Sequence, residues 1–312
     1  MNRIAGYHFG WLDQDGAPTL GRSGKYLRAA LALITTGACG IGEGIGIRAA
    51  SAVELVHNFS LLHDDIMDAD EMRRGRSTAW AVFGTPLALL TGDGLLAAAY
   101  GEIMEATHDA THAVAAYRLL AGTVESLILG QAMDLDFETR GTSVEPAECG
   151  TMHRGKTGAL LSCACALGAA AGGEEAGRVE TLGQFGMHLG QSFQISDDIL
   201  GIWGNPEVTG KPLWNDLRRQ KKTFPVVAAL AAGGHNSAEL AQLMVHPDWH
   251  LDGEKLARSV HLIEEAGGLE AAEAEAQRNY NKCLAILDSL SFEGVAREQL
   301  LQIVEFAVNR KF

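Results

Sequence analysis

The sequence predicts an all-α fold, and three observations carry that prediction. Only seven prolines occur in 312 residues, so few helix-breaking positions interrupt the chain. Alanine and leucine, the strongest helix formers among the apolar residues, are abundant. Apolar residues recur at three- and four-residue spacings, whereas the alternation of a half-buried strand is rare. We therefore expect long amphipathic helices and little β-structure.

Helices are expected, in chain order, wherever this spacing is sustained. They cover residues 25–34, 49–65, 113–138 and 179–200. Glycine and proline gather between such segments, at residues 83–88, 140–148, 203–212 and 231–239, as is typical of short connections between helices. No stretch is long or biased enough to be a linker, so we expect a single domain over residues 1–312.

Charge and cysteine content exclude several classes of function. A formal net charge of -14 argues against a nucleic-acid partner, because binding to phosphate backbones needs a basic surface. The five cysteines form no CxxC pair and no metal-ligand spacing, so we expect reduced thiols in a cytoplasmic protein. The most apolar stretches are rich in alanine and glycine, which argues against stable membrane insertion.

A first segment combines paired aspartates with basic residues. Residues 61–76 read LLHDDIMDADEMRRGR and follow an apolar helical run. On a helix, Asp64 and Asp68 lie at i and i+4 and project from one face, with Asp65 about 100° around the axis. Like charges at this spacing repel each other. We therefore expect a positive partner, either the arginines that follow or a bound cation.

A second segment repeats the pattern. Residues 193–201 read FQISDDILG and again end an apolar run in paired aspartates, Asp197 and Asp198. Basic residues follow them at Lys211, Arg218, Arg219, Lys221 and Lys222. Two carboxylate faces suit Mg²⁺, which prefers oxygen ligands and bridges to substrate phosphates, whereas zinc would require His or Cys at ligand spacing. The sequence therefore predicts a magnesium site shared with an anionic substrate.

DDIMD (64–68) and DDILG (197–201) resemble the two aspartate-rich motifs of the trans-isoprenyl diphosphate synthases, the polyprenyl synthetase family. The resemblance extends over nearly the whole chain. Further family blocks are matched in the expected order by GKYLRA (24–29), ELVHNFSLLHDD (54–65), GQAMDL (130–135), HRGKTGAL (153–160) and TGKPLWNDLRRQKKTFP (209–225). The resemblance implies an isoprenoid-synthase helical bundle around a central active-site cavity, and a homodimer.

The resemblance also implies a reaction, the Mg²⁺-dependent head-to-tail condensation of isopentenyl diphosphate with an allylic diphosphate. The allylic substrate loses pyrophosphate, the double bond of isopentenyl diphosphate attacks the resulting cation, and a proton is then removed. Positive groups aimed at the leaving pyrophosphate supply most of the rate in such a reaction. The implied ligands of three magnesium ions are Asp64, Asp68, Asp197 and Asp198. The implied allylic-diphosphate groups are Arg73, Lys156, Thr157, Gln194, Lys211 and Lys221. Of all these, Asp64, Asp68, Arg73, Lys156 and Lys211 are the implied catalytic residues.

The second diphosphate needs its own basic pocket. The resemblance implies that isopentenyl diphosphate is bound by Lys25, Arg28, His57 and Arg74. It also implies that Phe59 and Ser60, four to five residues before Asp64, form the floor that limits chain length. One aromatic, one small serine and no insertion in the first motif resemble geranylgeranyl diphosphate synthases, so we expect a twenty-carbon product. Farnesyl diphosphate, with fifteen carbons, is the alternative.

Two other functions remain open at this point. A class I terpene cyclase shares the fold and the metal-binding carboxylates but would not need the second basic pocket. A non-catalytic subunit of a heteromeric synthase typically lacks an aspartate motif, and here Gly201 stands where many relatives carry a third aspartate. We expect this glycine to weaken metal binding at the second motif without abolishing it.

Overall fold

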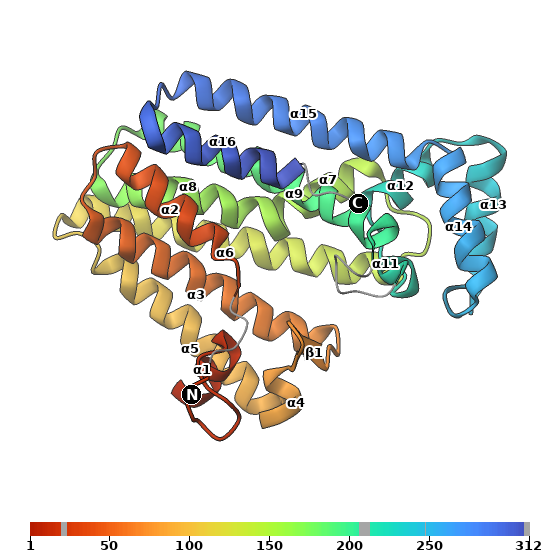
Figure 1. The fold of residues 1–312 in the computed structure, drawn as a ribbon, viewed down its shortest axis with the longest axis horizontal. Coiled ribbons are helices and arrows are strands. Elements are labelled where there is room, and N and C mark those ends of the chain that lie inside the picture. Colours follow the sequence, from red (N-terminus) through yellow and green to blue (C-terminus); the bar gives the residue numbers. More distant parts are fainter. Residues whose placement is uncertain (20–23, 206–212, 247, 309–312) are drawn as a thin grey trace. The chain divides into compact units, whose positions relative to one another are not determined.

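The computed structural model describes residues 1–19, 24–205, 213–246 and 248–308, and the all-α prediction is confirmed (Figure 1). The described residues form helices apart from short connections and one two-stranded hairpin, which the sequence did not predict. The chain divides into two compact units, and each is described by itself. Three helices pass from one unit into the other, namely α6 (Ala110–Thr139), α8 (Ala159–Gly172) and α9 (Ala176–Trp203).

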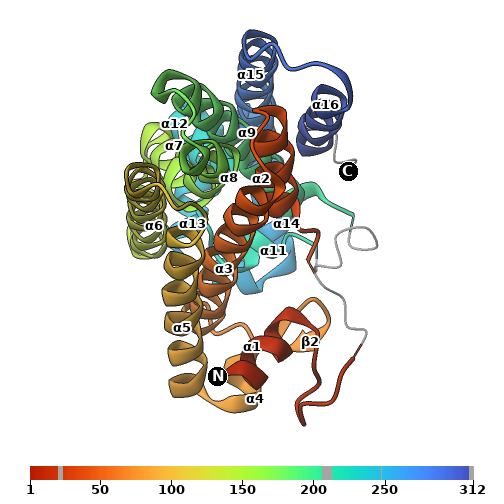
Figure 2. The same ribbon diagram turned by 90° about the vertical axis from the view of Figure 1, so that its left-hand side faces the viewer.

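The first unit comprises Met1–Gly122 and Cys163–Glu180. Its complete elements are α1 (Asn2–Phe9), α2 (Leu27–Ala38), α3 (Glu43–Met67), β1 (Met72–Arg73), β2 (Arg76–Ser77), α4 (Ala79–Phe83) and α5 (Thr85–Met104). The long helices α3 and α5 lie side by side (Figure 2), and α2 packs on α3. Small and branched apolar residues of these helices, such as Leu31, Val53 and Ala99, are fully buried between them. This core supports the carboxyl end of α3, where the first aspartate motif lies.

The second unit comprises Thr123–Ser162 and Thr181–Phe312. Its complete elements are α7 (Pro146–His153), a π-helical turn η1 (Arg154–Gly158), α11 (Asn215–Arg218), α12 (Phe224–Ala231), α13 (Gly234–Val245), η2 (Trp249–Leu251), α14 (Gly253–Glu265), α15 (Gly268–Ser289) and α16 (Gly294–Val308). One apolar cluster joins the end of α6 to α7, α9, α12 and α15, through residues such as Phe137, Met152 and Phe224. A second cluster surrounds Trp249 beside α12 and α14. The first cluster places α7 and α9 next to each other.

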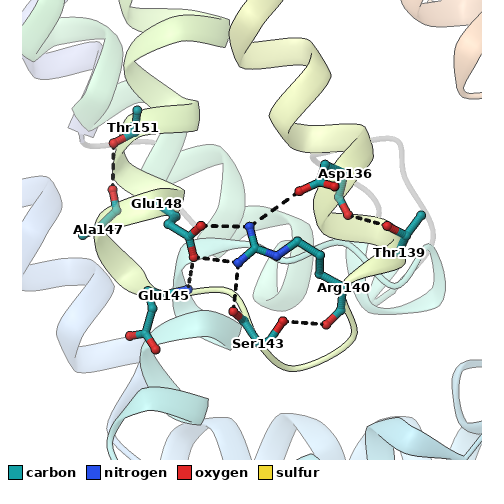
Figure 3. A network of polar contacts seen from close by, with 8 residues as sticks. All are labelled: Asp136, Thr139, Arg140, Ser143, Glu145, Ala147, Glu148 and Thr151. Carbon is teal, nitrogen blue, oxygen red and sulfur yellow. Dashed lines mark hydrogen bonds and ion pairs between the residues drawn. The ribbon is translucent and has the colours of Figure 1, made fainter.

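The start of α7 is fixed by local chemistry (Figure 3). Arg140 donates to both carboxylate oxygens of Glu148, at 2.8 and 2.9 Å, and to the carbonyl of Ser143 at 3.1 Å. Glu148 in turn accepts from the backbone N–H of Glu145, which with Pro146 begins the helix. These contacts satisfy N–H groups that a helix start leaves without intrahelical partners. The loop after α6 therefore delivers α7 in a defined orientation.

Two helices, α5 and α6, are long and apolar enough to cross a bilayer by length and composition. Both helices are longer than the alanine- and glycine-rich helix α8, one of the stretches from which the lack of stable membrane insertion was expected. Core helices of a helical bundle meet the same criterion. The absence of stable membrane insertion stays a prediction.

Candidate active site

The first aspartate motif closes helix α3, and its carboxylates have different surroundings. Asp64 and Asp68 are partly exposed, and Asp68 caps the helix after Met67. Asp65 is only 1% exposed, and Arg73 Nε donates a 2.6 Å hydrogen bond to its Oδ1. The face predicted from the i, i+4 spacing therefore consists of the two partly exposed carboxylates, while the middle aspartate holds Arg73.

The buried carboxylate of Asp65 is incompletely satisfied. Its Oδ2 is buried and makes no hydrogen bond. Burial raises the pKa of Asp65 to about 6, although the Arg73 guanidinium acts in the opposite direction. An arginine is well suited to this position because it stays charged when partly desolvated.

A tight hairpin presents Arg73 and Arg74. Strand β1 pairs with β2 through Arg73 and Arg76, and Arg74 and Gly75 between them both have positive φ, 54° and 78°. Two central residues with positive φ define the two-residue turn that matches the twist of a hairpin. The turn leaves Arg73 facing Asp65 and puts Arg74 at the tip.

All four residues predicted for isopentenyl diphosphate belong to the first unit, and three of them, Arg28, His57 and Arg74, interact there. Arg28 Nη1 lies 3.3 Å from His57 Nε2. Burial, followed by the charges of Arg28 and Arg74, lowers the pKa of His57 well below its ordinary value. The imidazole is therefore neutral at pH 7 and offers one donor to a ligand. Lys25, the fourth residue, is exposed and precedes α2, which begins at Leu27 and not at residue 25 as expected.

Helix α1 adds a histidine that the sequence analysis missed. His8 lines a cavity of about 20 Å³, room for a water molecule, together with Asp65, Arg73 and Arg74. Its Nε2 is buried and makes no hydrogen bond. Burial first, and then Arg73 and Arg74, lower the pKa of His8 to about 3. The segment NRIAGYHF matches no family block, so no signal in the sequence pointed to it.

Three of the residues predicted for the allylic diphosphate, Lys156, Thr157 and Gln194, lie in the second unit on the π-helical turn η1 and on α9. Lys156 Nζ forms a 2.5 Å ion pair with Asp134 Oδ2 of α6. Thr157 Oγ1 donates a 2.6 Å hydrogen bond to Gln194 Oε1. The backbones of α6 and η1 approach closely beside the Lys156–Asp134 pair, since a Cβ on Gly130 would collide with the main chain of Lys156. π-Helical turns are frequent at functional sites.

The second aspartate motif also separates its two carboxylates. Asp197 is partly exposed, whereas Asp198 is 4% exposed. His153 Nε2 lies 3.1 Å from Asp198 Oδ2. Burial opposes the charge on each partner, but the pair outweighs it, so the pKa of His153 is raised well above its ordinary value and that of Asp198 is lowered. His153 had no assigned role in the sequence, although it begins the matched block HRGKTGAL.

The remaining predicted residues are placed as follows. Phe59 is 6% exposed on α3, with its ring centroid 4.8 Å from that of His63 in an edge arrangement. Ser60, partly buried, donates to the carbonyl of His57. Lys221 is partly buried just before α12. Lys211 lies outside the described residues.

Left-handed backbone conformations of non-glycine residues cluster in these motifs. Of the six that occur among the described residues, five flank or belong to motif segments: Tyr26, Ala69, Arg74, Trp214 and Gln220. Each such conformation costs about 1 to 2 kcal/mol. Strained backbone of this kind concentrates at ligand-binding sites, where the surrounding structure holds it in place.

Gly201, the departure from the family pattern, faces the carboxylate of Asp216. A Cβ at position 201 would overlap Asp216 Oδ2 and lie 2.5 Å from its Cγ. Asp216 precedes the basic segment that leads to α12 and so belongs to the block TGKPLWNDLRRQKKTFP. The structure therefore brings a carboxylate to the place from which the third aspartate of the motif would project.

The donor set fits magnesium. The partly exposed carboxylates are hard oxygen donors, and no three His, Cys, Asp or Glu side chains within the described ranges converge as a closed metal cage. Mg²⁺ typically binds through one or two carboxylates plus substrate phosphates and water. Asp64 and Asp68 in one unit and Asp197 in the other are suited to that mode.

The comparisons with known proteins agree with the motifs. A profile of the family described as polyprenyl synthetase matches residues 10–257. The chain is 39% identical over 313 residues to a (2E,6E)-farnesyl diphosphate synthase of Mycobacterium tuberculosis, covering 100% of this chain and 86% of that protein. It is 43% identical over 284 residues to a geranylgeranyl diphosphate synthase of the same species, covering 91% of this chain and 80% of that protein.

Solved structures give the same result. The crystal structure of a polyprenyl synthetase from Streptomyces coelicolor superposes with a TM-score of 0.91 at 44% identity, covering 98% of this chain and 91% of that one. A geranylgeranyl pyrophosphate synthase from Corynebacterium glutamicum, solved with isoprenyl diphosphate and magnesium, has a TM-score of 0.81 at 25% identity and covers 93% of this chain and 87% of that one.

The fold and the two aspartate motifs therefore define a prenyltransferase of the helical class that makes trans-prenyl diphosphates. The chain belongs to the polyprenyl synthetase family. As a member of this Mg²⁺-dependent family it condenses isopentenyl diphosphate with an allylic diphosphate. Its relatives carry both farnesyl and geranylgeranyl names, so family membership alone leaves product length open.

Proposed function

We propose that the protein makes geranylgeranyl diphosphate, the twenty-carbon product. The observation that carries this proposal is the pair at the floor of the predicted cavity, where one buried aromatic, Phe59, stands beside a small side chain, Ser60. At a rise of about 1.5 Å per residue, this pair lies roughly 6 to 7.5 Å below Asp64 along α3, on the order of one isoprene unit. Ser60 bonds back to the helix carbonyl of His57 and so adds little bulk. Farnesyl diphosphate is the second candidate, supported by the relatives of that name.

The protein's own residues would work as follows. Lys25, Arg28, His57 and Arg74 bind the diphosphate of isopentenyl diphosphate. Lys156, Thr157 and Gln194 bind the allylic diphosphate, together with Arg73, Lys211 and Lys221. Asp64, Asp68 and Asp197 would hold three magnesium ions with substrate bound, and Asp198 is the fourth predicted ligand. When bound, the ions stabilise the negative charge that develops on the leaving pyrophosphate.

The grouping of basic residues in the first unit supports chain elongation over cyclisation. Arg28 Nη1 and His57 Nε2 lie 3.3 Å apart in the first unit, and both lie outside the aspartate motifs. A basic pocket separate from the metal ligands suits a second diphosphate, which a terpene cyclase does not bind. The arginine at position 74 adds a further cation to this pocket, since its charge acts on His57.

Product analysis tests the proposal. With Mg²⁺, isopentenyl diphosphate and allylic starters of graded length, the expected end product is geranylgeranyl diphosphate. Phe59→Ala should lengthen the product, because a smaller side chain opens volume at the floor. Ser60→Phe, the matched variant, should shorten it to fifteen carbons. If both variants kept activity and the wild-type product distribution, these residues would not be the floor, and an end product of fifteen carbons in the wild type would establish the farnesyl alternative.

We also propose a homodimer in the cytoplasm. Large apolar side chains are exposed on α5 and α6: Leu87, Leu90, Met104, Val114, Tyr117, Ile128 and Leu129. In the second unit, Leu129 also lines an open, mainly apolar hollow of about 670 Å³ beside α7 and α9. A second copy would cover such faces, which are unusual on monomers. Light scattering of the purified protein should give twice the chain mass, and Leu90→Asp should shift it to the monomer; a monomeric wild type would contradict the dimer.

The cytoplasmic location is supported by the five cysteines, which are free thiols, as in a reducing compartment.

A further inference from the structure

A buried histidine contacts the second aspartate motif, and the proposed function assigns it no task. His153 ends helix α7 and is 2% exposed. Its Nε2 lies 3.1 Å from Asp198 Oδ2 and 3.7 Å from the Sγ of Cys149, one helical turn earlier. All of these residues belong to one compact unit.

Asp198 has both carboxylate oxygens engaged. Oδ2 also accepts a 2.9 Å hydrogen bond from the backbone N–H of Phe224, at the start of α12. Oδ1 accepts a 2.9 Å hydrogen bond from Gln194 Nε2, one turn earlier on α9. A direct ligand of a hydrated ion must present an oxygen toward solvent. Asp197, about 100° around the same helix, is partly exposed, whereas Asp198 is only 4% exposed.

The contacts continue from Asp198 into the residues proposed for the allylic diphosphate. Gln194, which donates to Asp198, accepts from Thr157 Oγ1 at 2.6 Å. Cys149 Sγ contacts the carbonyl of Lys222 at 3.7 Å, next to Lys221. His153 and Cys149 therefore hold both the π-helical turn and the segment that enters α12.

Helix α7 is itself held rigidly at its start. The Arg140 clamp fixes Glu148, the neighbour of Cys149, with two hydrogen bonds (Figure 3). Positioning groups are effective when they stand on rigid elements and are themselves hydrogen-bonded. The clamp provides that support from the loop after α6.

We propose that His153 is a positioning residue for the prenyl transfer. Through Asp198 and Gln194 it fixes Thr157 and the start of α12. Asp198 is then an anchor, a buried carboxylate that holds its neighbours in place, and Asp197 alone of the pair faces magnesium. This division of roles rests on the proposed magnesium and allylic-diphosphate sites. It departs from the sequence prediction, in which both aspartates are metal ligands.

A pair of conservative variants tests the role of His153. The amide nitrogen of His153→Gln reaches about as far as Nε2, whereas that of His153→Asn is too short to reach Asp198. His153→Asn should raise the KM of the allylic diphosphate about 10-fold or more, as loss of a supporting hydrogen-bond partner does. His153→Gln should restore it to within about threefold, and the KM of isopentenyl diphosphate should stay unchanged in both. Equal KM values in both variants and the wild type would overturn the positioning role.

The role of Asp198 is tested by binding without turnover. The measurement is the rise in Tm on adding Mg²⁺ with inorganic pyrophosphate. The wild type should show a rise and Asp197→Asn should lose it, while the double variant His153→Gln, Asp198→Asn, which keeps the buried positions polar, should retain most of it. If the double variant lost the rise as Asp197→Asn does, Asp198 would be a ligand and the anchor proposal would fail. If the wild type itself showed no rise, the magnesium assignment would fail, and the division of roles with it.

A matched histidine controls for general effects on folding. His188, also on α9, bonds through Nδ1 to Asn279 Oδ1 at 2.9 Å and touches none of the proposed ligands. His188→Asn should change the Tm without a selective change in the allylic KM. A selective change in that variant as large as in His153→Asn would show that the KM reports helix packing and not the anchor, and would overturn the proposal.

Discussion

The two aspartate motifs look alike in sequence but differ in how their buried carboxylates are satisfied. In each motif the first aspartate, Asp64 or Asp197, is partly exposed and the second, Asp65 or Asp198, is buried. Asp65 has one side-chain partner, Arg73, and its pKa is raised by burial. Asp198 has three partners, and its pKa is lowered. Each motif therefore combines one partly exposed carboxylate with one buried carboxylate, the anchor. The two motifs differ in how many groups pair with the buried carboxylate.

The origin of the partners explains the difference. Arg73 reaches Asp65 from a hairpin that begins only a few residues after α3, and it is itself partly exposed. The partners of Asp198 come from α7, α9 and the start of α12. His153 is 2% exposed, Phe224 belongs to the apolar cluster, and Gln194 is partly buried. A buried charge needs several partners, whereas a charge near the surface retains some solvation from water.

The largest expected effect comes from breaking the better anchor. His153→Leu leaves the Asp198 carboxylate buried without its cation and should destabilise the protein by about 3 to 5 kcal/mol. Arg73→Leu should cost only about 1 to 2 kcal/mol, since the Arg73 side chain is 29% exposed and solvent screens its interaction with Asp65. Urea unfolding followed by circular dichroism measures both. Equal losses would show that the two anchors are equivalent.

Removing an outward carboxylate should affect rate and not stability. Asp64→Asn and Asp197→Asn should each lower kcat about 10²-fold or more, because each removes a group proposed to hold charge-stabilising ions. Their unfolding midpoints should match the wild type. Asp288→Asn, an exposed carboxylate on α15 that pairs with Arg297, is the control and should keep full activity. Near-normal turnover in both motif variants would refute their assignment as ligands.

The ends of the two motifs offer a third test. The first motif ends in Asp68 and the second in Gly201, whose missing side chain leaves room for Asp216. Gly201→Asp, which restores the common family residue, should destabilise the protein by about 1 to 3 kcal/mol, because the added carboxylate overlaps another. The double variant Gly201→Asp, Asp216→Gly should recover most of that loss. Stability unchanged in the single variant would show that Asp216 moves aside freely.

The smallest expected effect is a pH dependence of the free energy of unfolding that comes from Asp65, the anchor of the first motif. The folded-state pKa of Asp65, about 6, lies above the unfolded value, so the folded protein binds this proton more tightly. Stability from this group is present below about pH 4 and is lost as pH rises through about 6. Relative to Asp65→Asn, the wild type should therefore lose about 1 to 2 kcal/mol between pH 4 and pH 7, allowing for solvent screening. Urea titrations of both proteins at four pH values measure this, and a constant difference would contradict the raised pKa.

The long helices, and in each motif the partly exposed aspartates, could be predicted from the sequence. Helix spacing predicted α3, α6 and α9, whose bounds enclose the expected segments, and the i, i+4 rule placed Asp64 and Asp68 on one face. The family blocks identified Arg28 and His57, which the structure brings into contact. These features are local, or are carried by residue types at fixed spacing, so a linear sequence contains them.

Tertiary structure alone decided which aspartate of each pair is buried and what satisfies it. The sequence treats Asp197 and Asp198 as equivalent neighbours, but α7 and the start of α12 cover only one of them. His8, His153 and Asp216 reach the motifs from segments whose spacing to them carries no pattern. The free energy of a buried carboxylate depends on the donors around it in space, and packing of distant segments determines those donors.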